Sequence, residues 1–139
     1  MSGGWLLDTN VLSELTRPKP APAVVGFLER AEPAFVSAVS LHELRFGVER
    51  LAPGRRQEEL RRWLAELETL YADGILPVGA AEADQAARLR ADAAQRGRTV
   101  HLADGLIAGT AVRHGLALAT RDVVDFAGLP LRTVDPWTA

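Results

Sequence analysis

The chain of 139 residues contains no cysteine, which excludes disulfide bonds and metal sites built on thiolates. Histidine is scarce as well, with three residues in the chain. These three histidines do not have the spacing of a metal-binding motif. No stretch is long and apolar enough to cross a membrane, and the N-terminus lacks the basic region and apolar stretch of a signal peptide. We therefore expect a cytoplasmic protein without a membrane partner.

Lysine is almost absent too, because Lys19 is the only lysine among 16 basic residues. Together with 18 acidic residues this gives a net charge of −2, which by itself does not indicate a nucleic-acid-binding protein. Arginine can nevertheless bind a phosphate through two parallel hydrogen bonds. The arginines form two clusters, which either contact phosphates or cover solvated helix surfaces. They are Arg55, Arg56, Arg61 and Arg62, and Arg88, Arg90, Arg96 and Arg98.

Hydrophobic residues make up 47% of the chain, enough for one domain with a real core over residues 1–139. Short apolar stretches alternate with stretches of helical periodicity, which predicts an α/β fold with a mainly parallel sheet. Strands are expected at residues 4–8, 34–38, 75–78, 116–120 and 131–134. Helices are expected at residues 41–51, 55–71, 80–95 and 102–113.

Two segments receive a more specific interpretation. The proline-rich stretch from Arg17 to Ala23 predicts a loop or an irregular helix junction. The helix expected from Arg55 to Tyr71 has a wide apolar face with Trp63 at its centre. Part of this face is expected to join the core and part to contact a partner, for which we expect a second copy of the chain.

Four acidic residues lie where the expected elements meet. Asp8 and Asp122 follow the first and fourth expected strands, Glu43 lies in the first turn after the second, and Asp104 begins a largely apolar helix. In open parallel sheets, ligands bind outside the carboxyl ends of the strands. The four carboxylates are therefore expected to share one site.

Each acid also has a local explanation. Asp8 fits a helix N-cap, and Ser40 and Glu43 have the spacing of a capping box. Asp104 fits the favourable charge at a helix N-terminus, and Asp122 and Asp125 fit the start of a last helical turn. Four independent caps at one end of one sheet are a less economical explanation than a shared site.

Carboxylates that lie close together repel one another unless a cation is bound among them. Oxygen ligands without cysteine or suitably spaced histidine favour Mg²⁺ or Mn²⁺ over zinc. Such an ion polarises a phosphoryl oxygen and activates water, which suits hydrolysis of a phosphodiester. The residues thus predict a site for one or two divalent ions formed by Asp8, Glu43, Asp104 and Asp122.

Four stretches together resemble the PIN-domain ribonucleases, and within them the VapC toxins, especially the FitB-like branch. They are LLDTNVLSEL, SLHELRFGVERL, ADGLIAGTA and ATRDVVDF, and their order and spacing match across nearly the whole chain. The resemblance implies a Rossmann-like α/β/α sandwich and a Mg²⁺- or Mn²⁺-dependent endoribonuclease. It implies that Asp8, Glu43, Asp104 and Asp122 are catalytic and that Asp8, Asp104 and Asp122 hold the metal. Thr120, Asn10 and Asp125 match accessory positions.

The resemblance also implies partners. A cognate VapB-like antitoxin is expected to cover the cleft, with contacts to operator DNA made only through the antitoxin, and a homodimer with RNA as the substrate is expected. An apolar antitoxin segment is expected on a rim formed by Leu44, Phe46 and Val48. A basic antitoxin side chain is then expected to neutralise the acids.

Three other classes of protein remain as alternatives. A receiver-like signalling domain would carry a paired acid beside Asp8 and a lysine after the last strand, whereas the only lysine is Lys19. A dehalogenase-like phosphatase would have a second aspartate at the place of Asn10. A PIN fold without activity, used only for binding, is disfavoured by the complete set of four acids.

Overall fold

The computed structural model describes residues 3–139, in which five parallel strands form one sheet of order β3-β2-β1-β4-β5. The strands are β1 (Trp5–Leu7), β2 (Ala34–Ser37), β3 (Ile75–Leu76), β4 (Ala117–Ala119) and β5 (Thr133–Val134). The expectation of a mainly parallel sheet is confirmed. β3, followed by Pro77, lies at a sheet edge as expected, because proline cannot donate to a further ladder.

The register of the strands levels their carboxyl ends. Leu7, the last residue of β1, pairs with Val36 on one side and Ala119 on the other. The chain therefore leaves β1 at Asp8 and β4 at Thr120 on the same edge of the sheet, and the backbone N–H of Asp8 donates to the carbonyl of Ala119 at 2.9 Å. The carboxyl ends of the strands, which we call the carboxyl edge, carry the candidate site.

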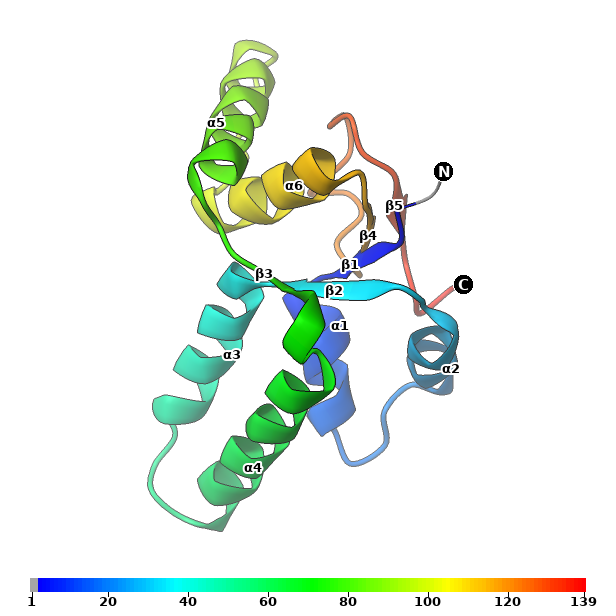
Figure 1. Ribbon diagram of the computed structural model, residues 1–139, viewed down its shortest axis with the longest axis vertical. Helices are drawn as coiled ribbons and strands as arrows, with labels where there is room; N and C mark the ends of the chain where they lie inside the picture. Colours follow the sequence, from blue (N-terminus) through cyan, green and yellow to red (C-terminus); the bar gives the residue numbers. More distant parts are fainter. Residues whose placement is uncertain (1–2) are drawn as a thin grey trace.

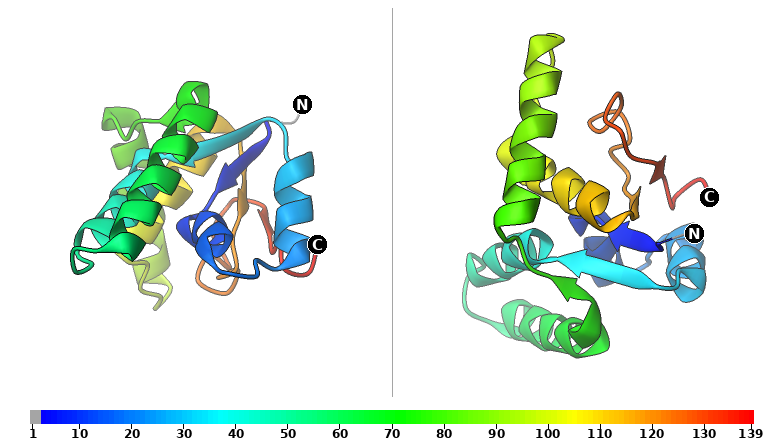
Figure 2. Two further views of the ribbon diagram at one scale, coloured as in Figure 1. Left: turned by 90° about the horizontal axis from the view of Figure 1, so that it is seen from below. Right: turned by 45° about the horizontal axis from the view of Figure 1, so that its top comes forward.

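Within residues 3–139, six α-helices cover both faces of the sheet, with α5 and α6 on one face and α1 to α4 on the other (Figures 1 and 2). They are α1 (Thr9–Ser13), α2 (Pro22–Arg30), α3 (Ala38–Glu49), α4 (Arg55–Leu70), α5 (Ala80–Gln95) and α6 (Leu102–His114). Short 3-10 turns occur at Glu14–Thr16 and Ala72–Gly74. In the described part of the chain, no helix has the length and apolar character needed to cross a membrane.

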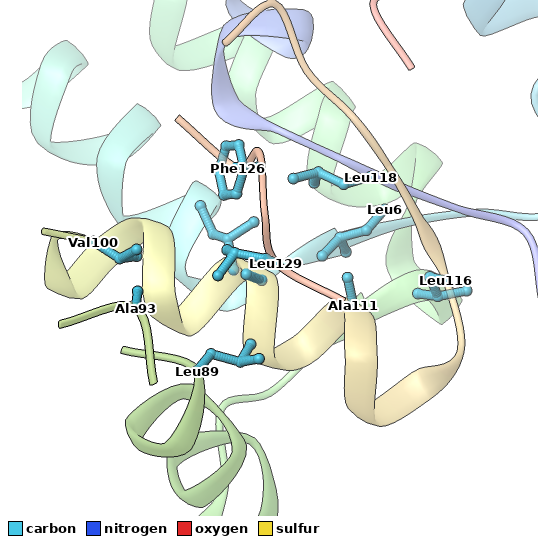
Figure 3. Packing of buried hydrophobic residues seen from close by; sticks show 11 residues of the cluster. Leu6, Leu89, Ala93, Val100, Ala111, Leu116, Leu118, Phe126 and Leu129 are labelled. Atoms are coloured by element: carbon cyan, nitrogen blue, oxygen red, sulfur yellow. The ribbon is translucent and has the colours of Figure 1, made fainter. Parts of the chain in front are cut away.

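One core cluster fills the space between the sheet and the α5–α6 pair (Figure 3). Leu6 and Leu118 contribute from the sheet, and Phe126 contributes from the loop after β4. Gly109 brings the two helices together, because a Cβ atom there would lie 2.7 Å from the backbone nitrogen of Ala86. The loop after β4, which carries Asp122, is thus tied to the core by Phe126.

The second core cluster lies on the opposite face, against α1 to α4. Leu7, Val36 and Ala119 contribute from the sheet. Leu64 and Leu67 of α4 are buried in it, whereas Trp63 is half-buried and Leu70 is exposed. The division of the α4 face into a core part and an accessible part is therefore confirmed.

The proline-rich stretch from Arg17 to Ala23 joins two helical segments, which is one of the two structures expected for it, but a helix begins inside it. Arg17 to Ala21 form the expected loop, but Pro22 is the first residue of helix α2, which the sequence analysis did not assign. Proline suits this place because its missing N–H would be unsatisfied in the first turn of any helix. Val24 and Phe27 bury the face of α2 in the second core cluster.

Candidate active site

Asp8 is held by two hydrogen bonds at the carboxyl end of β1. Its Oδ1 accepts from the backbone N–H of Thr9 at 2.8 Å, which makes Asp8 the N-cap of α1. Its Oδ2 accepts from the hydroxyl of Thr120 at 2.7 Å. The local explanation as an N-cap is therefore correct, but the second oxygen is fixed by a strand more than a hundred residues away.

The Asp8 carboxyl is only 6% exposed, and burial raises its pKa from 3.8 to about 6. The hydrogen bonds from Thr120 and Thr9 lower this pKa, whereas the charges of Asp104 and Glu43 raise it further. Among the described residues no cation lowers it. The site thus holds a buried carboxylate that lacks a counter-charge.

Glu43 reaches the site because α3 begins earlier than expected. The helix starts at Ala38 with Ser37 as its N-cap, whose hydroxyl accepts from the backbone N–H of Val39 at 3.0 Å. The local explanation of Glu43 as part of a capping box with Ser40 therefore does not hold, and the placement of Glu43 in the first turn is wrong. Relieved of a capping role, Glu43 points its carboxylate toward α1.

Thr9 is the residue that fixes Glu43. The Thr9 hydroxyl donates to Glu43 Oε1 at 2.6 Å and lies 2.9 Å from the hydroxyl oxygen of Ser40. Thr9 was not among the residues predicted from the sequence, although it stands between two that were, Asp8 and Asn10. A polar triplet directly after an apolar strand was the available signal.

Asp104 lies in the first turn of α6 and is half-buried. Burial raises its pKa, and the charges of Asp125, Glu43 and Asp122 raise it further, while His101 at the N-cap position opposes this shift. The expected position at a helix N-terminus is confirmed. The same charges show that Asp104 shares its surroundings with Glu43, Asp122 and Asp125.

Asn10 links α1 to the loop after β4. Its Nδ2 donates to Asp122 Oδ2 at 3.0 Å and lies 3.5 Å from the Thr120 hydroxyl oxygen. Its Oδ1 accepts from the backbone N–H of Arg121 at 3.3 Å. Asp122 also begins a local turn, as its local explanation expected, because its carbonyl accepts from the backbone N–H of Asp125 at 2.9 Å and residues 123–128 form consecutive turns.

The four acids share one region without forming a ready-made coordination shell. Within residues 3–139, no three Asp, Glu, His or Cys side chains lie close enough to hold a metal ion together. The hydrogen bonds explain the spacing, because Asp8, Glu43 and Asp122 each direct an oxygen to a neighbouring hydroxyl or amide. The predicted convergence of all four acids on one ion is thus looser than the sequence suggested.

The donor set nevertheless fits a magnesium ion. Mg²⁺ retains several waters and is usually bound by one or two carboxylates rather than by a complete protein cage. Every candidate ligand is a carboxylate oxygen, and the pKa values of Asp8 and Asp104 are raised mainly by burial and further by the neighbouring carboxylates. Metal binding at this edge therefore stays a prediction that the chemistry of the residues supports.

The apolar rim near the acids differs from expectation. Leu44 and Val48 are 7% and 4% exposed and belong to the core, so only Phe46, at 60%, is available to a partner. An open apolar groove of about 460 Å³ lies instead between the beginnings of α3 and α6. Its lining includes Ala38, Val39, His42, Val78, Leu102 and Leu106.

The histidines do not form a rival site. His114 pairs with Glu82 Oε2 at 2.9 Å, where α6 packs on α5. His42 stacks on the ring of Phe46 along α3, with the ring centroids 6.4 Å apart. His101 is exposed beside Asp104.

The fold and the acids at its carboxyl edge agree with the family model for the PIN domain, which matches residues 5–128. Toxin FitB of Neisseria gonorrhoeae is 38% identical over 135 residues, covering 95% of this chain and 97% of the relative. VapC ribonuclease Y4jK of Sinorhizobium fredii is 36% identical over 135 residues, covering 95% and 96%.

Two solved structures superpose on this chain over nearly its whole length. The crystal structure of FitAcB from Neisseria gonorrhoeae superposes with a TM-score of 0.91 at 38% identity, covering 97% of this chain and 99% of that one. The structure of FitAB bound to an IR36 DNA fragment gives a TM-score of 0.90 at 36% identity, covering 96% and 95%. This chain belongs to the PIN-domain proteins and, within them, to the VapC toxin family.

Proposed function

We propose that this protein is the toxin of a type II toxin–antitoxin system and acts as a Mg²⁺-dependent endoribonuclease. The observation that carries the proposal is the set of acids at the carboxyl edge, in which Asp8 is buried and no cation stands beside it. Membership of the VapC toxin family supports cleavage of RNA, because VapC ribonuclease Y4jK is 36% identical to this chain.

In this proposal Asp8, Asp104 and Asp122 hold the metal, with Mn²⁺ as a substitute for Mg²⁺. When bound, the ion polarises the phosphoryl oxygen and lowers the pKa of a bound water. Thr120 keeps Asp8 oriented through its hydrogen bond, and Asn10 does the same for Asp122. Asp125 adds negative charge to the same region.

Glu43 has a separate role. Its Oε1 accepts from the Thr9 hydroxyl, whereas its Oε2 has no hydrogen-bond partner among the described residues. Oε2 is therefore free to accept a proton from the attacking water. The water would add to phosphorus as the bond to the 3′-oxygen breaks, and that oxygen would take up a proton from solvent. The products would then carry a 5′-phosphate and a 3′-hydroxyl, and no covalent intermediate is required.

The experiment incubates the protein with RNA in Mg²⁺, in Mn²⁺ and in EDTA, and then maps the new ends. We expect metal-dependent cleavage, including at a 2′-deoxy position, because the 2′-hydroxyl is not the nucleophile. Products that end in a 2′,3′-cyclic phosphate would refute this mechanism. An absence of cleavage under every metal condition would refute the proposed activity.

A VapB-like antitoxin is the proposed regulatory partner, and operator DNA is proposed to be contacted only through it. The groove beside His42 and Leu102, together with exposed Phe46, replaces the rim expected from the sequence as the place for an apolar antitoxin segment. A basic antitoxin side chain among the acids would then supply the missing counter-charge. Neutralising that side chain should restore cleavage more than it weakens the complex.

A homodimer stays part of the proposal. The accessible part of α4, with half-buried Trp63 and exposed Leu70, offers an apolar surface for it. A monomeric mass at micromolar concentration, measured by light scattering, would contradict this element without affecting the proposed reaction.

A further inference from the structure

Arg121 stands between two residues of the candidate site, Thr120 and Asp122, at the carboxyl end of β4. Its backbone N–H donates to Asn10 Oδ1 at 3.3 Å, and the amide of the same Asn10 donates to Asp122 at 3.0 Å. The backbone of Arg121 is therefore held in a fixed place beside the acids.

The Arg121 guanidinium lies over the ring of Trp137, with its central carbon 4.8 Å from the ring centroid. Trp137 follows β5, and its half-buried ring packs against the second core cluster. The backbone N–H of Trp137 donates to Asp135 Oδ1 at 2.9 Å, which fixes the turn that presents the ring. The aromatic platform under Arg121 is thus anchored in the core.

The arrangement leaves the hydrogen-bonding edge of Arg121 available. Arg121 is exposed, and among residues 3–139 its side chain has neither a carboxylate partner nor a carbonyl acceptor. Stacking engages the flat face of a guanidinium, whereas its N–H groups point outward in the plane. An in-plane fork of this kind matches the two oxygens of a phosphate.

The acids create a need for such a residue. Asp8 and Asp122 accept hydrogen bonds from hydroxyl, backbone and amide groups, and among residues 3–139 neither forms an ion pair with an arginine. A negatively charged RNA strand is repelled by such a region unless a cation beside it holds the backbone. Arg121 lies next to Asp122 along the chain but is stacked on Trp137, so its charge stays exposed to solvent instead of pairing with that acid.

We propose that Arg121, held flat on Trp137, binds a phosphate of the RNA strand next to the phosphate that is cleaved. The inference rests on the proposed function, since it assigns a binding residue for that substrate. Arg121 is a substrate-binding residue here, and Trp137 is the residue that positions it.

The molecule contains its own control for this pair. The Arg132 guanidinium lies 5.1 Å from the centroid of the Trp5 ring, in the same kind of stack. Trp5 begins β1 and Arg132 precedes β5, so this pair lies at the amino end of the sheet, opposite the acids. Replacing Arg132 removes the same charge and the same type of contact, but at a site distant from the proposed RNA-binding site.

The experiment measures RNA binding by fluorescence anisotropy in an Asp8→Asn background, which separates binding from cleavage. The probe is a fluorescein-labelled single-stranded RNA of roughly 12 nucleotides, titrated at several salt concentrations with Mg²⁺ present. Arg121→Gln should weaken binding about tenfold and lower the slope of log affinity against log salt by about 0.7. Arg132→Gln should change neither quantity.

Two further variants separate charge from geometry. Arg121→Lys keeps the charge and should retain the salt slope, but it should lose part of the affinity because an ammonium cannot form the planar fork. Trp137→Phe keeps a smaller ring in the core and should weaken binding less than Arg121→Gln. With Asp8 restored, Arg121→Gln should raise the KM for RNA while kcat changes little.

Failure of this inference can be distinguished from failure of the proposed function. If Arg121→Gln binds RNA as its parent does, or if Arg132→Gln weakens binding as much as Arg121→Gln, the inference is overturned. Cleavage of RNA by the wild-type protein in Mg²⁺ would leave the proposed function standing in either case. Thermal melts of the variants exclude a loss of folding as the cause.

Discussion

The acids at the carboxyl edge and the acids on the outer helices are the same residue types in opposite settings. Glu49 on α3 lies between two arginines, with Arg61 at 2.7 Å and Arg45 at 3.4 Å, and these contacts lower its pKa. Asp8 has threonine hydroxyl and backbone partners instead, and burial raises its pKa to about 6. Arginines are plentiful in this chain, yet the edge of the sheet keeps its carboxylates unpaired.

This contrast separates structural carboxylates from functional ones. Exposed ion pairs contribute little to stability, so the pairing of Glu49 with Arg61 across α3 and α4 is expected to add little to the stability of the fold. An unpaired buried carboxylate costs stability, and a fold tolerates that cost where a ligand supplies the missing charge. Replacing acids by amides in both regions therefore distinguishes the two roles.

The largest difference is expected in catalysis. Asp8→Asn keeps the size of the side chain but removes the charge proposed to hold the metal, so RNA cleavage should fall at least about 100-fold. Glu49→Gln removes an equal charge from the helix surface and should leave cleavage within about twofold of wild type. Initial rates in Mg²⁺ measure both. Full activity of Asp8→Asn would remove Asp8 from the proposed site.

The pH dependence of stability should differ in sign between the two acids. The folded-state pKa of Asp8 is raised from 3.8 to about 6, so protonation favours the folded state. Its contribution is complete below about pH 4 and is lost as the pH rises through 6. Between pH 7.5 and 4, metal-free wild type should gain roughly 2 kcal/mol in unfolding free energy relative to Asp8→Asn.

Glu49 should show the reverse. Its folded-state pKa is lowered from 4.5, so it stabilises the fold above that value and the contribution is lost on acidification. Urea unfolding of wild type, Asp8→Asn and Glu49→Gln, carried from neutral pH to about pH 3, tests both signs. Parallel pH profiles for wild type and Asp8→Asn would contradict the assignment of a raised pKa to Asp8.

Metal should reverse the cost of the unpaired acids. If Mn²⁺ binds only the folded state, a concentration of 100 times the Kd adds about 2.7 kcal/mol to the unfolding free energy. The melting midpoint of wild type should therefore rise with Mn²⁺, while that of Asp8→Asn should rise much less. Glu49→Gln should respond as wild type does. Equal midpoints with and without saturating Mn²⁺ would argue against a metal site here.

The smallest effect should come from the hydroxyl that orients Asp8. Thr120 is fully buried, and its hydroxyl donates to Asp8 and accepts from the backbone N–H of Asp122 at 3.0 Å. Thr120→Val should cost about 1 to 3 kcal/mol of stability and reduce cleavage about tenfold.

Thr110 provides the matched control. It is equally buried, but its hydroxyl donates to the carbonyl of Leu106 within α6, where the helix already supplies hydrogen bonds. Thr110→Val should cost less than about 1 kcal/mol and leave cleavage unchanged. Equal losses of activity in both variants would mean that Thr120 has only a structural role.

Much of the architecture was readable because it depends on patterns local in the chain. Apolar strands that alternate with amphipathic helices dictate a parallel sheet covered on both faces, and the register places Asp8 and Thr120 on the same edge. The beginning of α5 at Ala80 and the end of α6 near Gly115 followed from composition and from glycine at a helix end.

The errors occurred where one local pattern allows two structures. A proline-rich stretch reads equally as a loop or as the first turn of a helix, and the burial of Phe27 decided for α2. Ser37 and Ser40 are both acceptable N-caps, and the continuation of β2 to Ser37 placed the start of α3. Leu44 and Val48 were expected at the rim of the cleft. Their helical spacing shows that they share one face of α3, but it does not show whether that face meets the core or the solvent.

By itself the sequence determined the class of fold, the edge that carries the acids, and the oxygen character of the site, because strand order in the chain and residue type decide these properties. Only the tertiary structure decided that Thr9 binds Glu43, that Thr120 binds Asp8 and that Trp137 supports Arg121. Each of these contacts joins side chains from different elements of the fold. No local pattern encodes such distances, because they depend on the register and packing of elements far apart in the chain.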